Sequence, residues 1–290
     1  MNVLSLFDGI SCGRIALERA GIKIDTYYAS EIEPNSEIIS KNNYNDIIRL
    51  GDVTKWREWN IDWSTIDLLI GGSPCQGFSF AGKQLNFNDP RSKLFFEYVG
   101  ILNHLKSKNK NVKFLLENVV MKKEYEDVIT DNLKVKPILI NSEFVSAQRR
   151  ERLYWFNWDI KAPEMINNIR LIDVFDNTLN HRIIKIKHLE SIRKCKTYYQ
   201  YDQNLLGHNS QDQRYYDCYG KCNTLLKSSS SIPKVKVGDT IYLFTPEECE
   251  KLQTIPVGYT KGVSNQKRYE ALGNGWTVDV IAHIFKHISD

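Results

Sequence analysis

Short apolar runs and segments of helical spacing alternate through the first half of the chain. The expected strands cover residues 3–7, 26–30, 46–50, 66–70, 113–116, 135–140 and 153–156. Between several of them, apolar residues recur at the spacing of an amphipathic helix. Gly21 is expected to end the first helix, Pro34 to begin the second and Ser92 to cap a later one. This alternation predicts an α/β fold.

After Trp158 the alternation fades. Residues 160–209 mix short apolar runs with Lys, Arg, Asn and Tyr, including Tyr198-Tyr199-Gln200-Tyr201. Such side chains suit contacts with phosphates and base edges, although the tyrosines fit strand packing equally well. Thr245-Pro246-Glu247-Glu248 is typical of a helix start, and helical spacing returns over residues 268–288. The second half therefore predicts a separate small domain followed by helices.

Composition limits the class of protein. The chain has 290 residues, of which 42% are hydrophobic and 26% charged, as in a folded protein with one large domain or one large and one small. No apolar run approaches the roughly 20 residues of a membrane span, and Met1–Phe7 is too short and uncharged for a signal peptide. The six Cys are scattered. We therefore expect a cytosolic protein with reduced thiols.

The net charge of +4 is unevenly distributed. Residues 161–236 carry 13 Lys and Arg against 7 Asp and Glu, so the rest of the chain is slightly acidic. A basic segment beside a mildly acidic body favours a polyanionic partner for that segment. On charge alone, a solvated basic surface fits equally well.

The first expected strand leads into a glycine turn, Asp8-Gly9-Ile10-Ser11-Cys12-Gly13, and then into a helix. This order opens nucleotide-binding α/β folds, but the turn lacks the Gly-x-Gly-x-x-Gly pattern that binds a dinucleotide. Glu31 ends the second strand and is placed to bind ribose hydroxyls, while Asp52 follows the third and could accept from an adenine amino group. The alternatives are a charge at a helix N-terminus for Glu31 and an N-cap or turn for Asp52. Three successive strand ends with Gly, Glu and Asp favour a cofactor site.

Candidate chemistry follows the next strands. Gly71–Ser79 places Cys75 on a stiff turn after a buried strand, although a free Cys is more often a small buried hydrophobe. Glu117 lies where the fifth strand ends and is a candidate acid, and its alternative is an ordinary surface Glu. Arg150 and Arg152 would share one face of an extended segment and could bind phosphate or carboxyl groups, unless they form an exposed charge run.

In their order along the chain, these residues resemble the motifs of the DNA cytosine-5 methyltransferases. The resemblance covers nearly the whole chain and is highly specific as a set. The matching segments are Phe7-Asp8-Gly9 with Gly13, Glu31, Gly51-Asp52-Val53, Ser73-Pro74-Cys75-Gln76, Glu117-Asn118-Val119, Gln148-x-Arg150-x-Arg152, 214–225 and Gly273-Asn274-Gly275-Trp276-Thr277-Val278. The family's usual pattern is Phe-x-Gly-x-Gly, and this chain has Ser11 in place of the second glycine. The form with Ser11 is more similar to the animal de novo DNA methyltransferases. The segment before residue 214 is short for the family, so the target sequence is not predicted.

The resemblance implies a Rossmann-like class I S-adenosylmethionine-dependent methyltransferase fold with a second, smaller target-recognition domain. It assigns residues 1–157 and 264–290 to the catalytic domain, and residues 158–263 to the target-recognition domain and hinge. It implies methyl transfer to C5 of cytosine in duplex DNA by a monomer without a metal. A cytoplasmic, prokaryotic or phage-encoded protein associated with the nucleoid is expected, with restriction–modification, phage protection and regulation open as roles.

The same resemblance assigns roles to individual residues. Cys75 resembles the nucleophile that adds to C6 of a flipped-out cytosine, and Glu117 the acid that protonates or hydrogen-bonds N3. Arg150 and Arg152 would hold the base and stabilise the adduct. The implied S-adenosylmethionine contacts are Phe7, Asp8, Gly9, Ile10, Ser11, Glu31, Asp52, Val53, Asn274, Gly275 and Trp276. The implied DNA contacts are Gln76, Ser79 and Lys83, and the loop 78–90 would close over the substrate.

Four other interpretations compete with this one. An RNA cytosine-5 methyltransferase that modifies tRNA is the main alternative, and the basic segment and the context of Gln76 favour DNA over it. A catalytically inactive accessory subunit would be expected to lack Cys75 or Glu117, and both are present. A nicotinamide dehydrogenase is disfavoured by the glycine pattern. A zinc site built from Cys195, His208, Cys218 and Cys222 has irregular spacing and is also disfavoured.

Overall fold

The chain divides into two compact units. The computed structural model describes residues 1–74, 90–164, 168–184, 192–194, 199–201, 214–228 and 232–288. Unit 1 comprises Met1–Ile140, Glu151–Pro163 and Val280–Asp290, and unit 2 comprises Asn141–Arg150 and Glu164–Asp279. The domain boundaries expected from the sequence, 1–157 with 264–290 against 158–263, stay a prediction.

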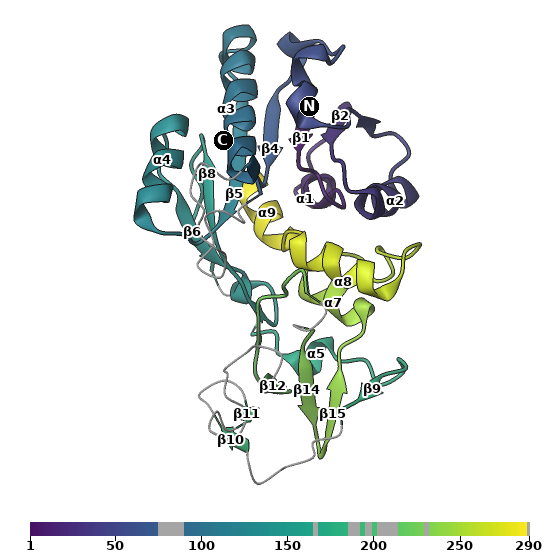
Figure 1. Ribbon diagram of the computed structural model, residues 1–290. Coiled ribbons are helices and arrows are strands. Elements are labelled where there is room, and N and C mark those ends of the chain that lie inside the picture. Colours follow the sequence, from purple (N-terminus) through teal and green to yellow (C-terminus); the bar gives the residue numbers. More distant parts are fainter. Residues whose placement is uncertain are drawn as a thin grey trace. The chain divides into compact units, whose positions relative to one another are not determined.

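A largely parallel sheet forms the centre of unit 1 (Figure 1). Among the described residues its strand order is β3-β2-β1-β4-β5-β8-β6. Strands β1 to β5 run parallel, and β8 runs antiparallel to β5. The bounds are β1 Asn2–Leu6, β2 Thr26–Ser30, β3 Ile48–Arg49, β4 Leu68–Gly71, β5 Lys113–Val119, β6 Ile138–Asn141 and β8 Glu151–Phe156. The chain reverses its direction of winding between β1 and β4, and ligands of such sheets bind at the carboxyl ends beside this point.

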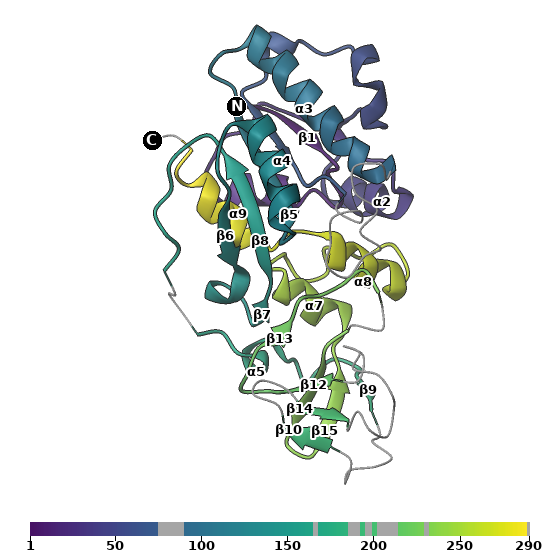
Figure 2. The same ribbon diagram turned by 60° about the vertical axis from the view of Figure 1, so that its left-hand side comes forward.

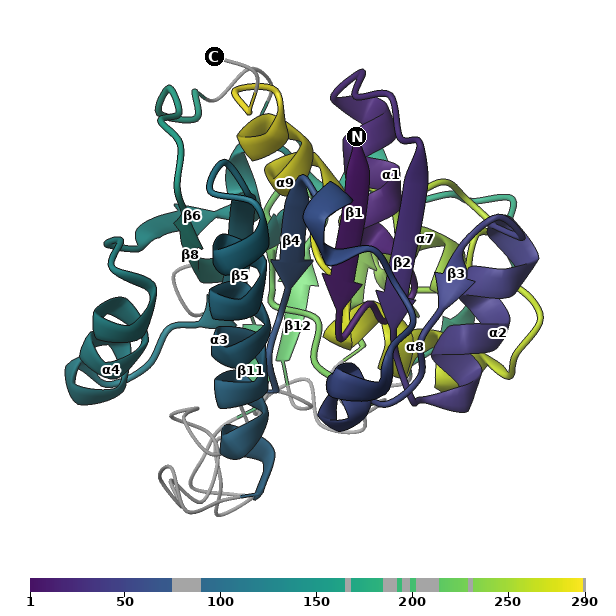
Figure 3. The ribbon, with the colours of Figure 1, turned by 90° about the horizontal axis from the view of Figure 1, so that it is seen from above.

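Helices cover the faces of this sheet (Figure 3). The helices of this part are α1 Cys12–Arg19, α2 Pro34–Asn43, α3 Pro90–Lys108, α4 Lys123–Leu133 and α9 Val278–Phe285, with the 3₁₀ turns η1 Val53–Glu58 and η2 Trp63–Thr65. Every residue of β4 is buried, as expected for a parallel strand with both faces covered. Leu6, Leu69 and Leu116 pack against Phe95 and Leu102 of α3 in the main apolar core.

Several expected elements are confirmed and others are shifted. The second helix begins at Pro34 as predicted, because proline fits the first helical turn. The prediction that Ser92 caps α3 is wrong, since the helix already begins at Pro90. The third strand was expected over residues 46–50, but β3 has two residues, which pair with β2 at the edge of the sheet as far as the structure describes it. The sixth strand begins at Ile138 rather than at residue 135.

Unit 2 contains its own sheets and helices (Figure 2). In its described residues one sheet has the order β10-β11-β12-β14-β15-β9, and β13 pairs with β7. The bounds are β7 Gln148–Arg149, α5 Leu171–Val174, β9 Arg182–Ile183, β10 Ile192–Lys194, β11 Tyr199–Tyr201, β12 Arg214–Asp217, β13 Cys222–Asn223, β14 Lys234–Val237, β15 Thr240–Leu243, α7 Pro246–Leu252 and α8 Asn265–Asn274. Thr245 and Glu248 form the predicted capping box of α7. The helical spacing over residues 268–288 belongs to two helices, α8 and α9, rather than one.

Candidate active site

The turn between β1 and α1 has an unusual backbone. Phe7, Gly9 and Ser11 have φ angles of 56°, 58° and 61°, in the left-handed region that favours glycine. A β-carbon added at Gly9 would meet no atom within 4 Å. The N–H of Asp8 donates to the carbonyl of Ser30, so the turn follows the end of β2 closely. The turn therefore offers open space at the edge where such sheets bind ligands.

Glu31 holds two neighbouring strand ends together. Its Oε2 accepts from the N–H of Gly9 at 2.7 Å, and its Oε1 accepts from the N–H groups of Ile32 and Glu33 at 2.8 Å each. A carboxylate can accept about four hydrogen bonds, so these three leave capacity for a ligand hydroxyl. Glu33, rather than Glu31, is the N-cap of α2, with its Oε2 accepting from the N–H of Ser36. Glu31 lies two residues before this N-cap, so its carboxylate is also a charge close to the N-terminus of α2, the alternative considered for it.

Asp52 is the N-cap of the short helical turn η1. This is the structural role that the sequence analysis gave as the alternative to a cofactor contact. Its Oδ1 accepts from the N–H and the hydroxyl of Thr54, both at 2.9 Å. The backbone N–H and then the hydroxyl of Thr54 hold the pKa of Asp52 below its usual value. The preceding Gly51 has φ 71°, and a β-carbon there would meet no atom within 4 Å. The carboxylate is thus fixed beside a second open glycine.

Asp8 turns its side chain toward other residues of unit 1. Its Oδ1 accepts from the hydroxyl of Tyr27 at 2.8 Å, and its Oδ2 accepts from that of Ser11 at 2.6 Å. Burial raises the pKa of Asp8, although these hydroxyls act in the opposite direction. By exposed surface Asp8 is half-buried, whereas Ser11, Ile10 and Val53 are buried, so these three expected cofactor residues have enclosed side chains.

One residue beside Glu31 was missed by the sequence analysis. The side chain of Ile32 is 70% exposed, although it follows a buried strand end. Because Ile32 directly follows Glu31, whose carboxylate accepts from the N–H of Gly9, its exposed apolar side chain is a candidate ligand contact. The available signal was an apolar residue directly after the acidic end of a strand.

Glu117 and Arg152 form an ion pair on adjacent strands. The Nε of Arg152 lies 3.0 Å from the Oε1 of Glu117, and the side chains are 13% and 11% exposed. In the β5–β8 register Arg152 faces Val119, two residues beyond Glu117, so the two side chains are diagonal neighbours on one face. The sequence predicted both residues separately, and the fold brings them together.

Asn118 links the end of β5 to the segment that leads to Cys75. Its Nδ2 donates to the hydroxyl of Ser73 at 3.2 Å, and its Oδ1 accepts from the N–H of Val119. Asn118 and Ser73 are both buried. Cys75 and the three expected DNA contacts, Gln76, Ser79 and Lys83, lie outside the described residues.

Arg150 has different partners from Arg152. Strand pairing is interrupted at Arg150, where its N–H donates to Oδ1 of Asn141. Within unit 2 its guanidinium donates to the carbonyls of Leu225, Gly273 and Gly275 at 3.0 to 3.2 Å. Only 4% of Arg150 is exposed. The expectation that both arginines lie on one face assumed an unbroken strand, and the structure assigns their guanidinium groups different partners.

The neighbours of Arg150 form a buried amide network in unit 2. Gln148 accepts at Oε1 from the N–H of Leu225 and donates to the Oε1 of Gln253. Gln253 in turn donates to the carbonyls of Leu272 and Gly275, and accepts from the hydroxyl of Thr277. Of the expected cofactor residues in this part, Asn274 is exposed, and Gly275 and Trp276 are half-buried. Their predicted role stays a prediction.

The thiols and acidic groups of the described residues show no metal-binding arrangement. No group of three or more His, Cys, Asp or Glu side chains could hold an ion in that part of the chain. Burial raises the pKa of Cys222 to about 12 and also raises that of Cys218, as expected for thiols packed in an apolar interior. Cys12 is buried. Cys195 and His208 lie outside the described residues.

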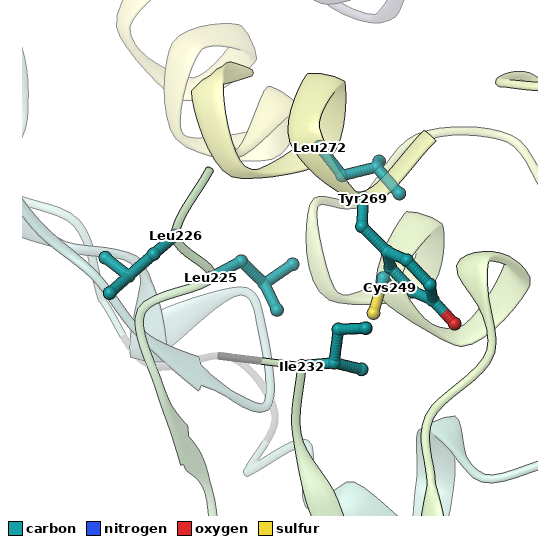
Figure 4. Close-up of a pocket in the computed structure, with 6 residues that line it drawn as sticks. All are labelled: Leu225, Leu226, Ile232, Cys249, Tyr269 and Leu272. Carbon is teal, nitrogen blue, oxygen red and sulfur yellow. The ribbon is translucent and has the colours of Figure 1, made fainter. Parts of the chain in front are cut away.

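A small apolar pocket occurs within unit 2 (Figure 4). It is lined by Leu225, Leu226, Ile232, Cys249, Tyr269 and Leu272. The Tyr269 hydroxyl donates to the carbonyl of Phe244, and burial raises the pKa of the Cys249 thiol well above its usual value. Converging polar groups, which ordinarily orient a ligand, are few in this lining.

The described helices include none long and apolar enough to cross a membrane.

The fold and this edge of the sheet define an α/β protein of the class I methyltransferase type, and comparisons with known proteins agree. The model of the family "C-5 cytosine-specific DNA methylase" matches residues 1–290. The chain belongs to this family, and it is a DNA cytosine-5 methyltransferase. The predicted family, fold and enzyme class are thereby confirmed. The family and fold also imply a methyl-donor cofactor and a DNA substrate.

Individual relatives are similar to this chain to different extents. Type II methyltransferase M1.ScrFI of Lactococcus lactis subsp. cremoris is 28% identical over 97% of this chain and 76% of its own length. Type II methyltransferase M.NgoBV of Neisseria gonorrhoeae is 40% identical, but over 41% of this chain and 28% of its own length. The structure of the methyltransferase EhMeth of Entamoeba histolytica matches with a TM-score of 0.73 and 18% identity, covering 99% of this chain and 97% of that one. At that identity the structural match supports the fold alone.

Proposed function

We propose that this DNA methyltransferase takes its methyl group from S-adenosylmethionine and acts on a cytosine flipped out of duplex DNA. The observation that carries the proposal is the Glu117–Arg152 pair, which lies in the same sheet as the open turn after β1. The family model extends over both features. The two relatives compared by sequence are type II methyltransferases of bacteria, and the matching family is one of DNA methylases, so neither finding favours the RNA alternative.

The edge formed by β1, β2 and β3 fits S-adenosylmethionine. The cofactor, when bound, supplies an electrophilic methyl group. Gly9 and Gly51 leave open space above the strand ends, and Glu31 has acceptor capacity for ribose hydroxyls. Ile32 offers exposed apolar surface for the flat face of a base. Asp52 would accept from the adenine amino group with its remaining capacity. Asn274, Gly275 and Trp276 would add further contacts, as the family resemblance implies.

Cys75 is the proposed nucleophile. Its thiolate would add to C6 of cytosine, which turns the ring into an enamine with a nucleophilic C5. Glu117 would donate to N3 of the base, which withdraws electron density and favours the addition. Arg152 would hold Glu117 in place and stabilise the adduct. After C5 is methylated, loss of the C5 proton to a base and departure of Cys75 would restore the aromatic ring.

The other predicted features enter as parts of the same proposal. The basic segment 161–236 would contact duplex phosphates, and Gln76, Ser79 and Lys83 would hold the gap left by the flipped base. One chain carries every residue that this scheme needs, so a monomer is the proposed active form. Its DNA substrate would place the protein with the genome of a bacterium or a phage, inside the cell.

A base analogue that blocks the last step tests this proposal. With fluorine at C5 there is no proton to remove after methylation, so the adduct persists. A random-sequence duplex containing 5-fluorocytosine should give a denaturant-resistant complex that requires S-adenosylmethionine. The complex should be absent for Cys75→Ala and retained for Cys12→Ala, a substitution of a buried thiol at the start of α1.

Transfer RNA that carries the same analogue provides the comparison. A complex formed on tRNA alone would overturn the DNA assignment and keep the covalent chemistry. A complex on DNA that survives Cys75→Ala would assign the nucleophile to another thiol. Sequencing of chemically converted genomic DNA from cells that express the protein would then give the target site.

A further inference from the structure

Ser11 has a backbone conformation that is costly for any residue with a β-carbon. Its φ of 61° and ψ of 36° lie in the left-handed region, and its side chain is fully buried. Glycine, which the family's usual pattern has here, adopts this conformation without steric cost. A serine persists in it only if its surroundings hold it there. The side-chain contacts of Ser11 therefore decide the shape of the cofactor turn.

A chain of hydrogen bonds runs from Arg49 through two serines to Asp8. Nη2 of Arg49 donates to Oγ of Ser40 at 3.1 Å, Oγ of Ser40 lies 2.7 Å from Oγ of Ser11, and Oγ of Ser11 donates to Oδ2 of Asp8 at 2.6 Å. Because an ionised carboxylate only accepts, the Ser11 proton points to Asp8, and the Ser40 hydroxyl must donate to Ser11. All donors point in one direction, from a cation to an anion. Such a chain is polarised along its length, which strengthens each bond.

Both ends of the chain are anchored. The guanidinium of Arg49 also donates to the carbonyls of Ile47 and Tyr44, which fixes it beside the end of α2. The Oδ1 of Asp8 accepts from the hydroxyl of Tyr27 on β2. Both oxygens of Asp8 therefore accept from side chains of unit 1. Ser40 is 3% exposed, so water competes little for these bonds.

We propose that Asp8, Ser40 and Arg49 are positioning residues that hold the Phe7–Ser11 turn in its cofactor-binding conformation. Asp8 acts through Ser11 and does not touch the cofactor. The inference rests on the proposed use of S-adenosylmethionine at this turn. Gly9, whose N–H binds Glu31, lies between Asp8 and Ser11, so a relaxed Ser11 would disturb the site that is proposed to bind the ribose.

A double-mutant cycle with Ser11→Gly tests this inference, with S-adenosylmethionine affinity measured by calorimetry on the full chain. Asp8→Ala should weaken affinity about tenfold in the unmodified chain, and less than about twofold in the Ser11→Gly background, because glycine keeps the left-handed backbone without help. Ser40→Ala should lose about threefold, and this loss should also vanish with Ser11→Gly. Equal losses in both backgrounds would overturn the proposal and assign Asp8 a direct contact.

Tyr44→Phe is the matched control. Tyr44 follows the end of α2, the helix that carries Ser40, and the substitution removes only the hydrogen bond from its hydroxyl to Glu18 of α1. The cofactor affinity should stay unchanged. Should Asp8→Ala fail to fold, Asp8→Asn and Ser40→Ala carry the same cycle. Failure of the unmodified chain to bind S-adenosylmethionine would refute the proposed cofactor instead. In that case the same double-mutant cycle can be measured by thermal unfolding of the free protein. If the effects of the substitutions at residues 8 and 11 on stability simply add, the inference is overturned.

Discussion

The Nε of Arg152 lies 3.0 Å from the Oε1 of Glu117, across the antiparallel pair of β8 and β5. Little of either side chain is exposed, so their attraction is screened less by water than that of a surface pair. The guanidinium fixes the orientation of the carboxyl group from one side. Asn118, the next residue along β5, binds Ser73 in the segment that leads to Cys75. The end of β5 thus links the proposed acid to the approach of the proposed nucleophile.

Glu117→Gln should abolish most of the turnover. The amide keeps the size of the side chain but cannot give a proton to N3, and general acid catalysis contributes about 10²- to 10⁴-fold. The expected result is a loss of kcat of at least about 100-fold with little change in S-adenosylmethionine affinity. Initial-rate methylation assays and calorimetry would measure the two quantities.

Glu126→Gln is the control for this substitution. Glu126 pairs with Lys123 on the exposed surface of α4, and surface pairs contribute little. Activity should remain unchanged. Turnover by Glu117→Gln equal to that of Glu126→Gln would remove Glu117 from the mechanism.

Glu31→Ala should weaken S-adenosylmethionine binding more than tenfold. The change removes the acceptor for the ribose and also releases the N–H of Gly9 from its 2.7 Å hydrogen bond. Calorimetry on the folded variant would measure the affinity. Glu37→Gln, which alters an exposed pair with Lys41 on α2, should bind normally. Unchanged affinity in folded Glu31→Ala would show that the carboxylate only organises the protein.

The fold of unit 1 and the positions of Gly9, Glu31 and Glu117 were accessible from the sequence. Short apolar runs that end in Gly, Glu or Asp predict where parallel strands stop, and the carboxyl ends of such strands meet at one edge. The apolar run 113–116 placed Glu117 at a strand end, and period-two alternation placed Arg152 in an extended segment, although neither pattern predicted which strands pair. Their contact depends on β8 running antiparallel to β5, which no local pattern encodes.

Arg150, Ser40 and Arg49 show where such prediction stops. The sequence placed Arg150 on an extended strand, but its partners are carbonyls more than 70 residues away in sequence. Ser40 is an unremarkable helix residue by propensity, and its significance comes from contact with Ser11 across the packed interior. Tertiary hydrogen bonds of this kind depend on the finished fold rather than on local spacing.

Gly273→Ala should destabilise the protein. A β-carbon there would lie 2.3 Å from the backbone carbon and oxygen of Leu226, and a backbone cannot swing aside as a side chain can. Overpacking of this kind costs about 1–3 kcal/mol, and we expect the upper end of that range. Gly100→Ala within α3 is the control, because its β-carbon would have an ordinary 3.6 Å contact with Trp56. Chemical denaturation should show a loss of stability for the first variant and none for the second.

Arg150→Met should lower the free energy of unfolding more than it impairs the chemistry. The methionine fills part of the space but leaves the carbonyls of Leu225 and Gly273 without the donor that Arg150 supplies, while Gly275 keeps its hydrogen bond from Gln253. Each unsatisfied group costs roughly 1–3 kcal/mol before relaxation, so we expect a loss of about 2–5 kcal/mol in total. Denaturant unfolding would measure the loss, and methylation rates below the transition would measure activity in the remaining folded protein.

Arg152→Lys should have the opposite effect, a loss of turnover with little loss of stability. The two substitutions together therefore distinguish the roles of the two arginines. Lysine keeps the charge beside Glu117 but lacks the planar fork, so orientation of the carboxyl group should suffer while stability changes little. We expect turnover to fall at least about tenfold. If Arg150→Met instead retained full stability and lost turnover, Arg150 would act on the base, as the family resemblance first implied. Its three carbonyl contacts argue against that outcome, because a guanidinium committed to the backbone has few donors left for a substrate.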